Sequence, residues 1–127
     1  MRLLLLVATG GAAGSVLRYL AGLAAKWIAG DSAFPWGTLV VNVLGCAAIG
    51  AVLDWLPSRG EQAEQWRCLL VVGVLGGFTT FSAFGAETLA LWRAGQLALA
   101  LANVAAQLLL GLAAVAGGAW LRASMAS

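Results

Sequence analysis

The residues best suited to chemistry lie in one stretch in the middle of the chain, GGFTTFSAFGAE at positions 76–87. Paired glycines and paired threonines lower helix propensity, because glycine adds backbone freedom and threonine hydroxyls compete for backbone partners. Phe81 and Phe84 follow at a spacing of three, which places both rings on one wall of a resumed helix, with Glu87 a further turn along. We therefore expect a helix broken over Gly76 to Thr80, with an aromatic wall directly after the break.

The composition predicts that this break lies inside a lipid bilayer. Of the 127 residues, 62% are hydrophobic and 9% charged, whereas soluble domains carry about 25% charged residues. The chain is thus expected to be an integral membrane protein. Lipid offers no hydrogen bonds, so a broken helix at membrane depth persists only where protein, an ion or a water-filled cavity takes over the freed backbone groups. The break is therefore a candidate functional site.

Several classes of function lack the residues that they need. The chain has no histidine and only two isolated cysteines, so zinc, haem, iron–sulfur and Cys–His chemistry lack ligands. No convincing pair of nucleophile and base is present for an enzyme. The net charge of +2 is too small to argue for nucleic-acid binding. We expect neither an enzyme nor a nucleic-acid partner.

The elements that must position the break are predicted to be four transmembrane helices, in a single all-α domain over residues 1–127. Each span needs roughly 20 apolar residues, and the apolar runs place the spans at about 3–25, 34–53, 68–92 and 97–121. A polar turn is expected at 26–35 and a surface loop at 54–67. The break then lies about 12 to 18 Å from the membrane surface at which the third span begins, near the bilayer centre.

Polar residues inside the other spans each leave two interpretations open. Arg18 lies about 23 Å along the first span, where it either extends to the lipid headgroups or lines an aqueous vestibule that concentrates anions. Asn42 falls near the midplane of the second span, as an interhelical hydrogen-bonding group or as a donor that lines a pore. Asn103 and Gln107 form a polar stripe on the fourth span, either as interhelical contacts or as a hydrogen-bonding track.

The distribution of charge allows the chain to insert either way up. With four spans, one side carries Arg2, Arg59, Arg67 and Arg122, and the other carries Lys26 and Arg93, with Arg18 if it reaches the surface. This is a weak bias under the positive-inside rule. An antiparallel homodimer would bring two broken helices together at its centre. The clustered carbonyl oxygens would suit a bare monovalent cation.

Three segments carry a resemblance to a known family. They are GGAAGSVLRY at 10–19, GTLVVNVLG at 37–45 and GGFTTFSAF at 76–84, followed by Glu87 and, in the fourth span, Asn103. With these segments the chain resembles the small bacterial fluoride channels called Fluc or CrcB along nearly its whole length. The third segment is highly specific. One departure is Gln107, where many members have serine or asparagine, and another is Gly111, which replaces a hydroxyl seen in some relatives.

The resemblance implies a dual-topology antiparallel homodimer in the inner membrane that releases fluoride passively and so gives fluoride resistance. It implies a structural sodium ion at the dimer centre, held by the carbonyl oxygens of Gly76 and Thr79. The implied fluoride pore is lined by Asn42, Thr80, Phe81, Ser82 and Phe84. Arg18 would lie in a vestibule and Glu87 near a pore end, while Asn103 and Gln107 are the less certain part of the pore track.

The pore rings suit fluoride for a physical reason. Fluoride is small and holds its water tightly, so a pore must return hydrogen bonds and positive potential at short range. Aromatic rings carry positive edges, and the amide of Asn42 adds donors. The competing hypothesis is a small dual-topology multidrug or cation antiporter. Such antiporters depend on an acidic residue in the first span, where this chain has Arg18 and no carboxylate. On the first span, Gly10, Gly14 and Gly22 share one stripe of the helix with Arg18 at four-residue spacing, which permits close contact with a neighbouring helix. A structural subunit would explain this glycine stripe but not the break.

Overall fold

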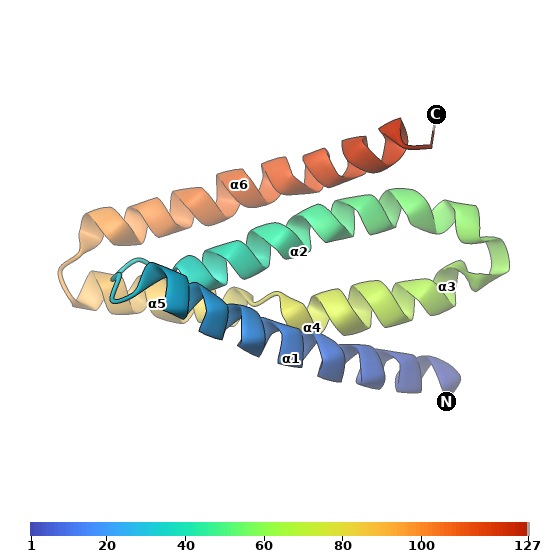
Figure 1. The fold of residues 1–127 in the computed structure, drawn as a ribbon, viewed down its shortest axis with the longest axis horizontal. Coiled ribbons are helices and arrows are strands. Elements are labelled where there is room, and N and C mark those ends of the chain that lie inside the picture. The colour runs from blue at the N-terminus through green and yellow to red at the C-terminus, as the bar shows by residue number, and fades with distance from the viewer. Residues whose placement is uncertain (127) are drawn as a thin grey trace.

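The chain folds into long apolar helices that lie side by side along one axis (Figure 1). The structure is a computed structural model and describes residues 1–126. Helices α1 (Arg2–Ala29) and α6 (Leu97–Ser124) have 28 residues each, and α2 (Trp36–Trp55) has 20. Their sequences contain no proline and are rich in alanine and leucine, so the backbone hydrogen bonds run without interruption. The first helix thus continues to Ala29, past the predicted end near residue 25.

The remaining helical segments connect α2 to α6. They are the 3₁₀ helix η1 (Leu56–Gln62), α3 (Ala63–Trp66), the π-helix η2 (Arg67–Leu75), α4 (Gly76–Phe78) and α5 (Phe81–Arg93). Three helical stretches of the described chain are long and apolar enough to cross a membrane: Arg2–Ala29, Trp36–Arg93 and Leu97–Ser124. The second has 58 residues, about 87 Å if it were straight. It turns back between α2 and α3 (Figure 1).

This turn lies in the segment predicted as a surface loop at 54–67. The segment is exposed over most of its length but helical, with Gly60 as the position of left-handed backbone (φ 52°) that breaks the helix direction. Glycine adopts this conformation without the cost that a Cβ would add. Trp55 and Trp66 pack edge to face with centroids 5.6 Å apart, and the guanidinium of Arg59 lies 4.4 Å from the Trp55 ring centre. These aromatic contacts stabilise the turn.

Glycines bring α1 directly against the backbone of η2 and α4. A Cβ on Gly10 would lie 3.0 Å from the Cα of Gly73, and one on Gly14 would lie 2.8 Å from the backbone nitrogen of Phe78. Neither contact leaves room for a side chain. The glycine spacing of the first span predicts this close approach. Gly22, the next member of the stripe, has no atom within 4 Å of such a Cβ and takes no part in it.

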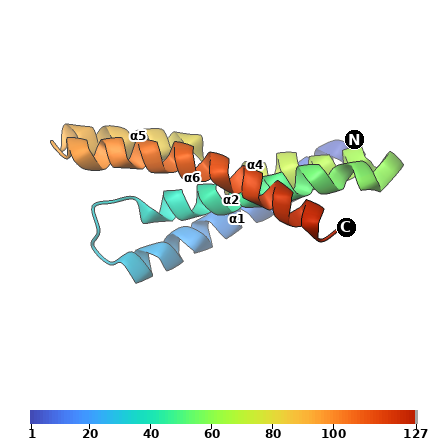
Figure 2. The same cartoon turned by 90° about the horizontal axis from the view of Figure 1, so that it is seen from above.

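A second close contact joins α2 to α6. A Cβ on Gly118 would lie 2.8 Å from the carbonyl carbon of Ala47, and one on Gly50 would lie 3.1 Å from the nitrogen of Ala119. Seen from above, α5 runs along α6, and α2 lies between α6 and α1 (Figure 2). The interrupted segment from η2 to α5 is therefore held by α1 along its first half and by α6 along its second.

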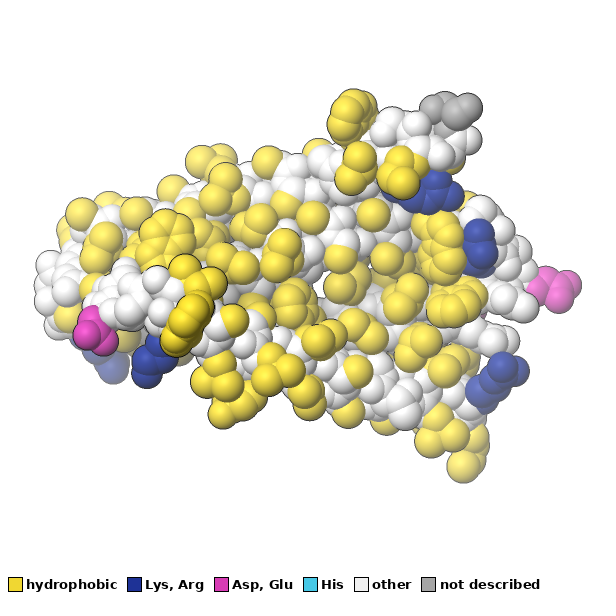
Figure 3. Space-filling view, viewed as in Figure 1, with side chains coloured by type: hydrophobic (Ala, Val, Ile, Leu, Met, Phe, Trp, Pro, Cys, Tyr) yellow, Lys and Arg dark blue, Asp and Glu magenta, His cyan; other side chains and the backbone are white. Residues whose placement is uncertain are grey.

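The face seen in Figure 3 is apolar over its middle and charged toward the two ends. Large apolar side chains are exposed along the helices, including Leu4 and Leu112 at 74% and 71%. Trp27 and Trp120 are exposed near helix ends, where tryptophan is typical of the membrane–water boundary. Such a surface is stable in lipid rather than in water. The chain is thus an all-helical membrane protein that crosses the bilayer more than once.

Candidate functional site

The break between α4 and α5 is shorter than the predicted Gly76 to Thr80. The helix continues through Phe78, and only Thr79 (ψ 158°) and Thr80 (φ −151°, ψ 110°) have extended backbone. Gly76 and Gly77 stay helical, and Gly77 serves a contact with α1: a Cβ on it would lie 3.1 Å from the Cα of Gly11. The prediction is therefore wrong for the first three residues. The threonines cause the break, since β-branched residues favour extended backbone.

Thr80 ends the break by capping α5. Its hydroxyl oxygen accepts a hydrogen bond of 3.1 Å from the backbone N–H of Ala83, the arrangement of a helix N-cap. The hydroxyls of Thr80 and Ser82 lie 3.2 Å apart and are hydrogen-bonded to each other. The new helix thus begins at Phe81, and a side chain of the motif itself accepts a hydrogen bond from a backbone N–H of its first turn.

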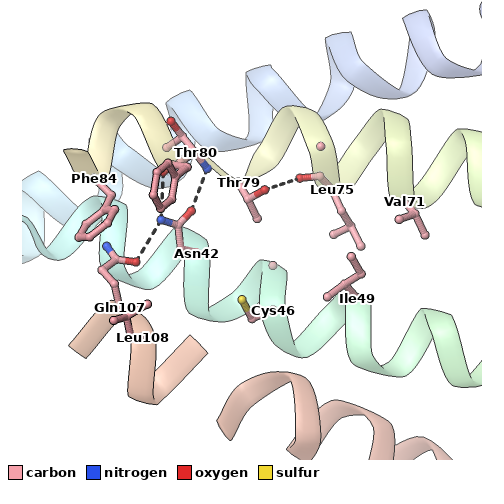
Figure 4. Close-up of a pocket in the computed structure, with 13 residues that line it drawn as sticks. Asn42, Cys46, Ile49, Val71, Leu75, Thr79, Thr80, Phe84, Gln107 and Leu108 are labelled. Carbon is pink, nitrogen blue, oxygen red and sulfur yellow. Dashed lines mark hydrogen bonds between the residues drawn. The ribbon is translucent and has the colours of Figure 1, made fainter. Parts of the chain in front are cut away.

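The side chain of Asn42 supplies the partners that the extended peptide group of Thr80 lacks (Figure 4). The backbone N–H of Thr80 donates to Oδ1 of Asn42 at 2.8 Å, and Nδ2 of Asn42 donates to the Thr80 carbonyl at 3.1 Å. The same nitrogen donates to Oε1 of Gln107 at 3.1 Å. One amide on α2 therefore joins the break to α6. Of the two interpretations of Asn42, the structure contains the interhelical one, and its place in a pore stays a prediction.

The carbonyl groups before the break have different partners. The N–H of Thr80, which would donate to Gly76 in an unbroken helix, is used by Asn42, so the Gly76 oxygen has lost that donor. The N–H and the hydroxyl of Thr79 both donate to the Leu75 oxygen at 2.9 Å. The Thr79 oxygen accepts a hydrogen bond of 3.1 Å from Nη1 of Arg18. Arg18 therefore points to the break.

A cavity of about 330 Å³ opens beside the break on the side of α2 and α6. Its polar and aromatic lining consists of Asn42, Thr79, Thr80, Phe81, Phe84 and Gln107, and its apolar lining includes Cys46, Ile49, Leu75 and Leu108. The rings of Phe81 and Phe84 meet edge to face with centroids 5.4 Å apart, and Phe81 is 81% exposed. Most of the predicted pore residues thus share one cavity. Ser82 is exposed and does not line it.

A second polar cluster lies further along α5. Thr38 donates to Oε1 of Glu87 at 2.7 Å, and Nδ2 of the fully buried Asn103 donates to the Thr88 hydroxyl at 2.9 Å. Oε2 of Glu87 and Oδ1 of Asn103 are buried and find no partner within residues 1–126. Asn103 therefore belongs to this cluster and not to the cavity at the break. Thr38 and Thr88 are not among the predicted site residues, although Thr38 precedes Asn42 by one helical turn.

The cavity can hydrogen-bond a small anion. Its lining combines amide groups and hydroxyls with the edges of two aromatic rings, and it contains no carboxylate. Ring edges carry partial positive charge. Groups of this kind bind an anion without the strong attraction that a fixed cation would add.

Comparison with known proteins identifies the sequences that this chain is similar to. The family described as "CrcB-like protein, Camphor Resistance (CrcB)" matches residues 5–119. A protein of Agrobacterium fabrum is 46% identical over 113 residues, which cover 89% of this chain and 90% of that protein. Proteins of Caulobacter vibrioides and Solibacter usitatus are 47% and 50% identical, over 93% and 92% of this chain and 93% and 95% of their own length. Each of the three is named "Fluoride-specific ion channel FluC".

Proposed function

Since this chain belongs to the CrcB-like family, we propose that it is a fluoride-specific ion channel of the inner membrane that lets fluoride leave the cell passively. It is a transport protein and not an enzyme. The observation that carries the proposal is the similarity to relatives named fluoride channels over at least 89% of the chain. Passive release down the electrochemical gradient confers resistance to fluoride without a chemical energy source.

The cavity beside the break supports an anion pathway at the residues of the family motif. Asn42, Thr80, Phe81 and Phe84 line it together. We assign these four residues to the fluoride pore, with Ser82 beside them through its hydroxyl contact to Thr80. The ring edges and the polar groups of the cavity lining can replace part of the water that fluoride loses. Arg18 adds positive potential at the break, and Glu87 lies further along α5, toward a pore end.

We further propose four membrane spans in one domain over residues 1–127. The 58-residue helical stretch Trp36–Arg93 folds back at Gly60, and each of its arms is long enough to cross a hydrocarbon core of about 30 Å. These arms are α2 and the segment from η2 to α5. Together with α1 and α6 they make four spans, with both termini and the turn at Gly60 on one side.

The working unit is proposed to be an antiparallel homodimer in which the second copy is inverted. Phe81 is 81% exposed at the mouth of the cavity, so the face that carries the motif is open in a single chain. Charged residues occur at both ends of the molecule, which suits insertion in either direction. A second copy on this face would complete the cavity walls and bring the two breaks together.

A structural sodium ion at the dimer centre is proposed to bind the carbonyl oxygens of Gly76 and Thr79. The Gly76 oxygen fits this role because the N–H of Thr80 has been taken by Asn42. The Thr79 oxygen accepts one hydrogen bond from Arg18 and keeps a second lone pair for a ligand. Carbonyl oxygens are suitable ligands for a hard monovalent cation, and the ion would hold the two interrupted helices in register.

Fluoride efflux from liposomes tests the proposed function directly. Purified protein reconstituted in liposomes loaded with fluoride should release it rapidly when valinomycin and a potassium gradient balance the charge, as read by a fluoride electrode. Liposomes loaded with chloride should release almost none. Absence of fluoride release above protein-free liposomes, or equal release of chloride, would contradict the function.

Labelling with a membrane-impermeant maleimide tests the inverted arrangement. Gln96 is exposed in the short turn before α6, so Gln96→Cys in a background of Cys46→Ala and Cys68→Ala places one thiol on a single side of each chain. In intact cells about half of the chains should react if both orientations occur. Complete labelling or none would show a single orientation.

A further inference from the structure

The directions of the hydrogen bonds around Asn42 determine which amide faces the cavity. We infer that the side-chain nitrogen of Gln107 donates the hydrogen bond to the anion at this site, and that Asn42 is a positioning residue that orients Gln107. This inference rests on the proposed function, since fluoride is the anion concerned. It assigns the role of donor to a residue on α6 and not to the amide on α2.

The orientation of the Asn42 amide is fixed by a backbone group. A peptide N–H only donates, so the 2.8 Å bond from the Thr80 nitrogen requires the oxygen of the Asn42 amide to face it. The amide nitrogen then faces the Thr80 carbonyl and Oε1 of Gln107, both at 3.1 Å. An amide nitrogen has two hydrogens. Both are used inside the protein, so Asn42 has none to offer to an ion.

The orientation of Gln107 follows from that of Asn42. Because Asn42 donates, the group of Gln107 that faces it is the oxygen, and the nitrogen points away. This nitrogen is buried and has no hydrogen-bond partner in the described chain, residues 1–126. In Figure 4 it points toward the ring of Phe84, within the cavity that both residues line. A buried donor without an acceptor is unfavourable unless a ligand supplies one.

An anion beside this nitrogen would complete a chain of hydrogen bonds that all point the same way. The Thr80 N–H donates to Asn42, Asn42 donates to Gln107, and Gln107 would donate to the ion. Bonds in such a series polarise one another and strengthen the last donor. A hydrogen bond to an ionised acceptor is about twice as strong as one between neutral groups. In the alternative arrangement the N–H of Gln107 binds no anion and makes only a weak contact with the Phe84 ring.

Two substitutions at Gln107 distinguish the effect of its hydrogen-bond donor from the effect of its volume. Gln107→Met keeps much of the volume and removes both hydrogens. Gln107→Glu keeps an oxygen for Asn42 and replaces the donor by a carboxyl group, which is an acceptor when ionised and a donor when protonated. Leu109→Met, on the exposed face of the same helix, is the matched control. Each protein is checked for wild-type elution in detergent and then measured for fluoride efflux at pH 7.5 and pH 5.5, with the leak of protein-free liposomes subtracted.

We expect Gln107→Met to lower efflux at least about tenfold at both pH values, in line with loss of a hydrogen bond to an ion. Gln107→Glu should be as slow at pH 7.5 and recover several-fold at pH 5.5, while wild type and Leu109→Met keep the same rate. The recovery compares a single protein, Gln107→Glu, at two pH values. It therefore remains a valid test even if Gln107→Met does not fold. Wild-type efflux in Gln107→Met, or a Gln107→Glu protein that is equally slow at both pH values, would overturn the inference. Absence of efflux from wild type itself would overturn the proposed function instead.

Discussion

The interrupted segment from η2 to α5 has two sides of opposite character. Toward α1 its glycines meet backbone with no space for a side chain, as at Gly73, where a Cβ would lie 2.9 Å from the Cα of Gly10. Toward α2 and α6 it leaves a cavity of about 330 Å³, with Asn42 and Gln107 on the far wall. The closed side is held by van der Waals contact, which is the main source of helix association in lipid. The open side is held by side-chain hydrogen bonds.

The difference shows how a helix can be broken in lipid without losing its position. The glycine contacts fix the backbone before the break, so the peptide group of Thr80 meets Asn42 at hydrogen-bond distance. Rigid placement on one side allows polar groups on the other to line a cavity instead of packing against each other. If this is correct, substitutions on the closed side should act on folding, and substitutions on the open side should act mainly on transport, with Asn42 acting on both.

Removal of the Asn42 amide should have the largest effect. Asn42→Ala leaves the Thr80 N–H, the Thr80 oxygen and the Gln107 oxygen without their partner, and each such group costs about 1–3 kcal/mol when it stays buried. The thermal unfolding temperature in detergent should fall strongly, and so should the rate of fluoride efflux. The matched variant Asn103→Ala loses one side-chain bond, to Thr88, and should unfold closer to wild type. Equal unfolding temperatures for the two variants would remove the special position of Asn42.

A methyl group on the closed side should have the next effect. Gly14→Ala places a Cβ against the backbone of Val74 and Phe78, which cannot move aside as a side chain can, and overpacking of this kind costs about 1–3 kcal/mol. Gly22→Ala on the same stripe meets no atom within 4 Å and serves as the control. The measurement is the thermal unfolding of both proteins in detergent. A Gly14→Ala protein as stable as Gly22→Ala would show that the closed side is looser than described.

The rings of the open side should affect transport with little effect on assembly. Phe81→Ile and Phe84→Ile each remove a ring edge from the cavity, and an aromatic contact of about 0.5–1.5 kcal/mol corresponds to a fall of up to about tenfold in efflux. Efflux is read in liposomes, and cross-linking reports the dimer. Wild-type rates in both variants would remove the rings from the pathway, and loss of the dimer would assign them to the interface.

The smallest effect is expected at Thr79, which lies between the two sides. Its methyl group packs against Gly45 and its hydroxyl bonds to the Leu75 oxygen. Thr79→Ser removes only the methyl and should cost about 0.5–1.5 kcal/mol of stability, as for other single buried methyl groups. Thr79→Val keeps the shape and removes the hydroxyl, and the Leu75 oxygen still accepts from the Thr79 N–H. The thermal unfolding temperatures of Thr79→Ser and Thr79→Val compare the contributions of packing and hydrogen bonding at the break. A large loss of stability in Thr79→Val alone would show that the hydroxyl matters more than the methyl group.

The sequence predicts the class of protein and the position of the break better than its details. Apolar runs locate the long helices, and the motif at 76–87 locates the two extended threonines within its predicted break. Helix propensity predicts a break at the glycines as well as at the threonines, because propensity alone does not show that Gly77 is in contact with Gly11. That contact depends on how α1 packs, which is a property of the folded molecule.

The partners of the polar residues could not be predicted for the same reason. Arg18 and the Thr79 oxygen are 61 positions apart, and Asn42 and Gln107 are 65 apart. Periodicity places such residues on one face of a helix, but it does not show which face of another helix they contact. The direction of each hydrogen bond, and hence the free nitrogen of Gln107, depends on a backbone N–H of the break. These details follow from the packing of the folded helices.

The position of Asn42 in the chain has a consequence for biosynthesis. It precedes Thr80 by 38 residues, and a ribosome makes the chain from the N-terminus at about 5–20 residues per second. The helix that carries the amide is therefore complete seconds before the peptide group that it must satisfy is synthesised. Gly10 and Gly14 are made earlier still. When the interrupted segment enters the bilayer, its partners in the first two helices have already been made, and those on α6, such as Asn103, are made later.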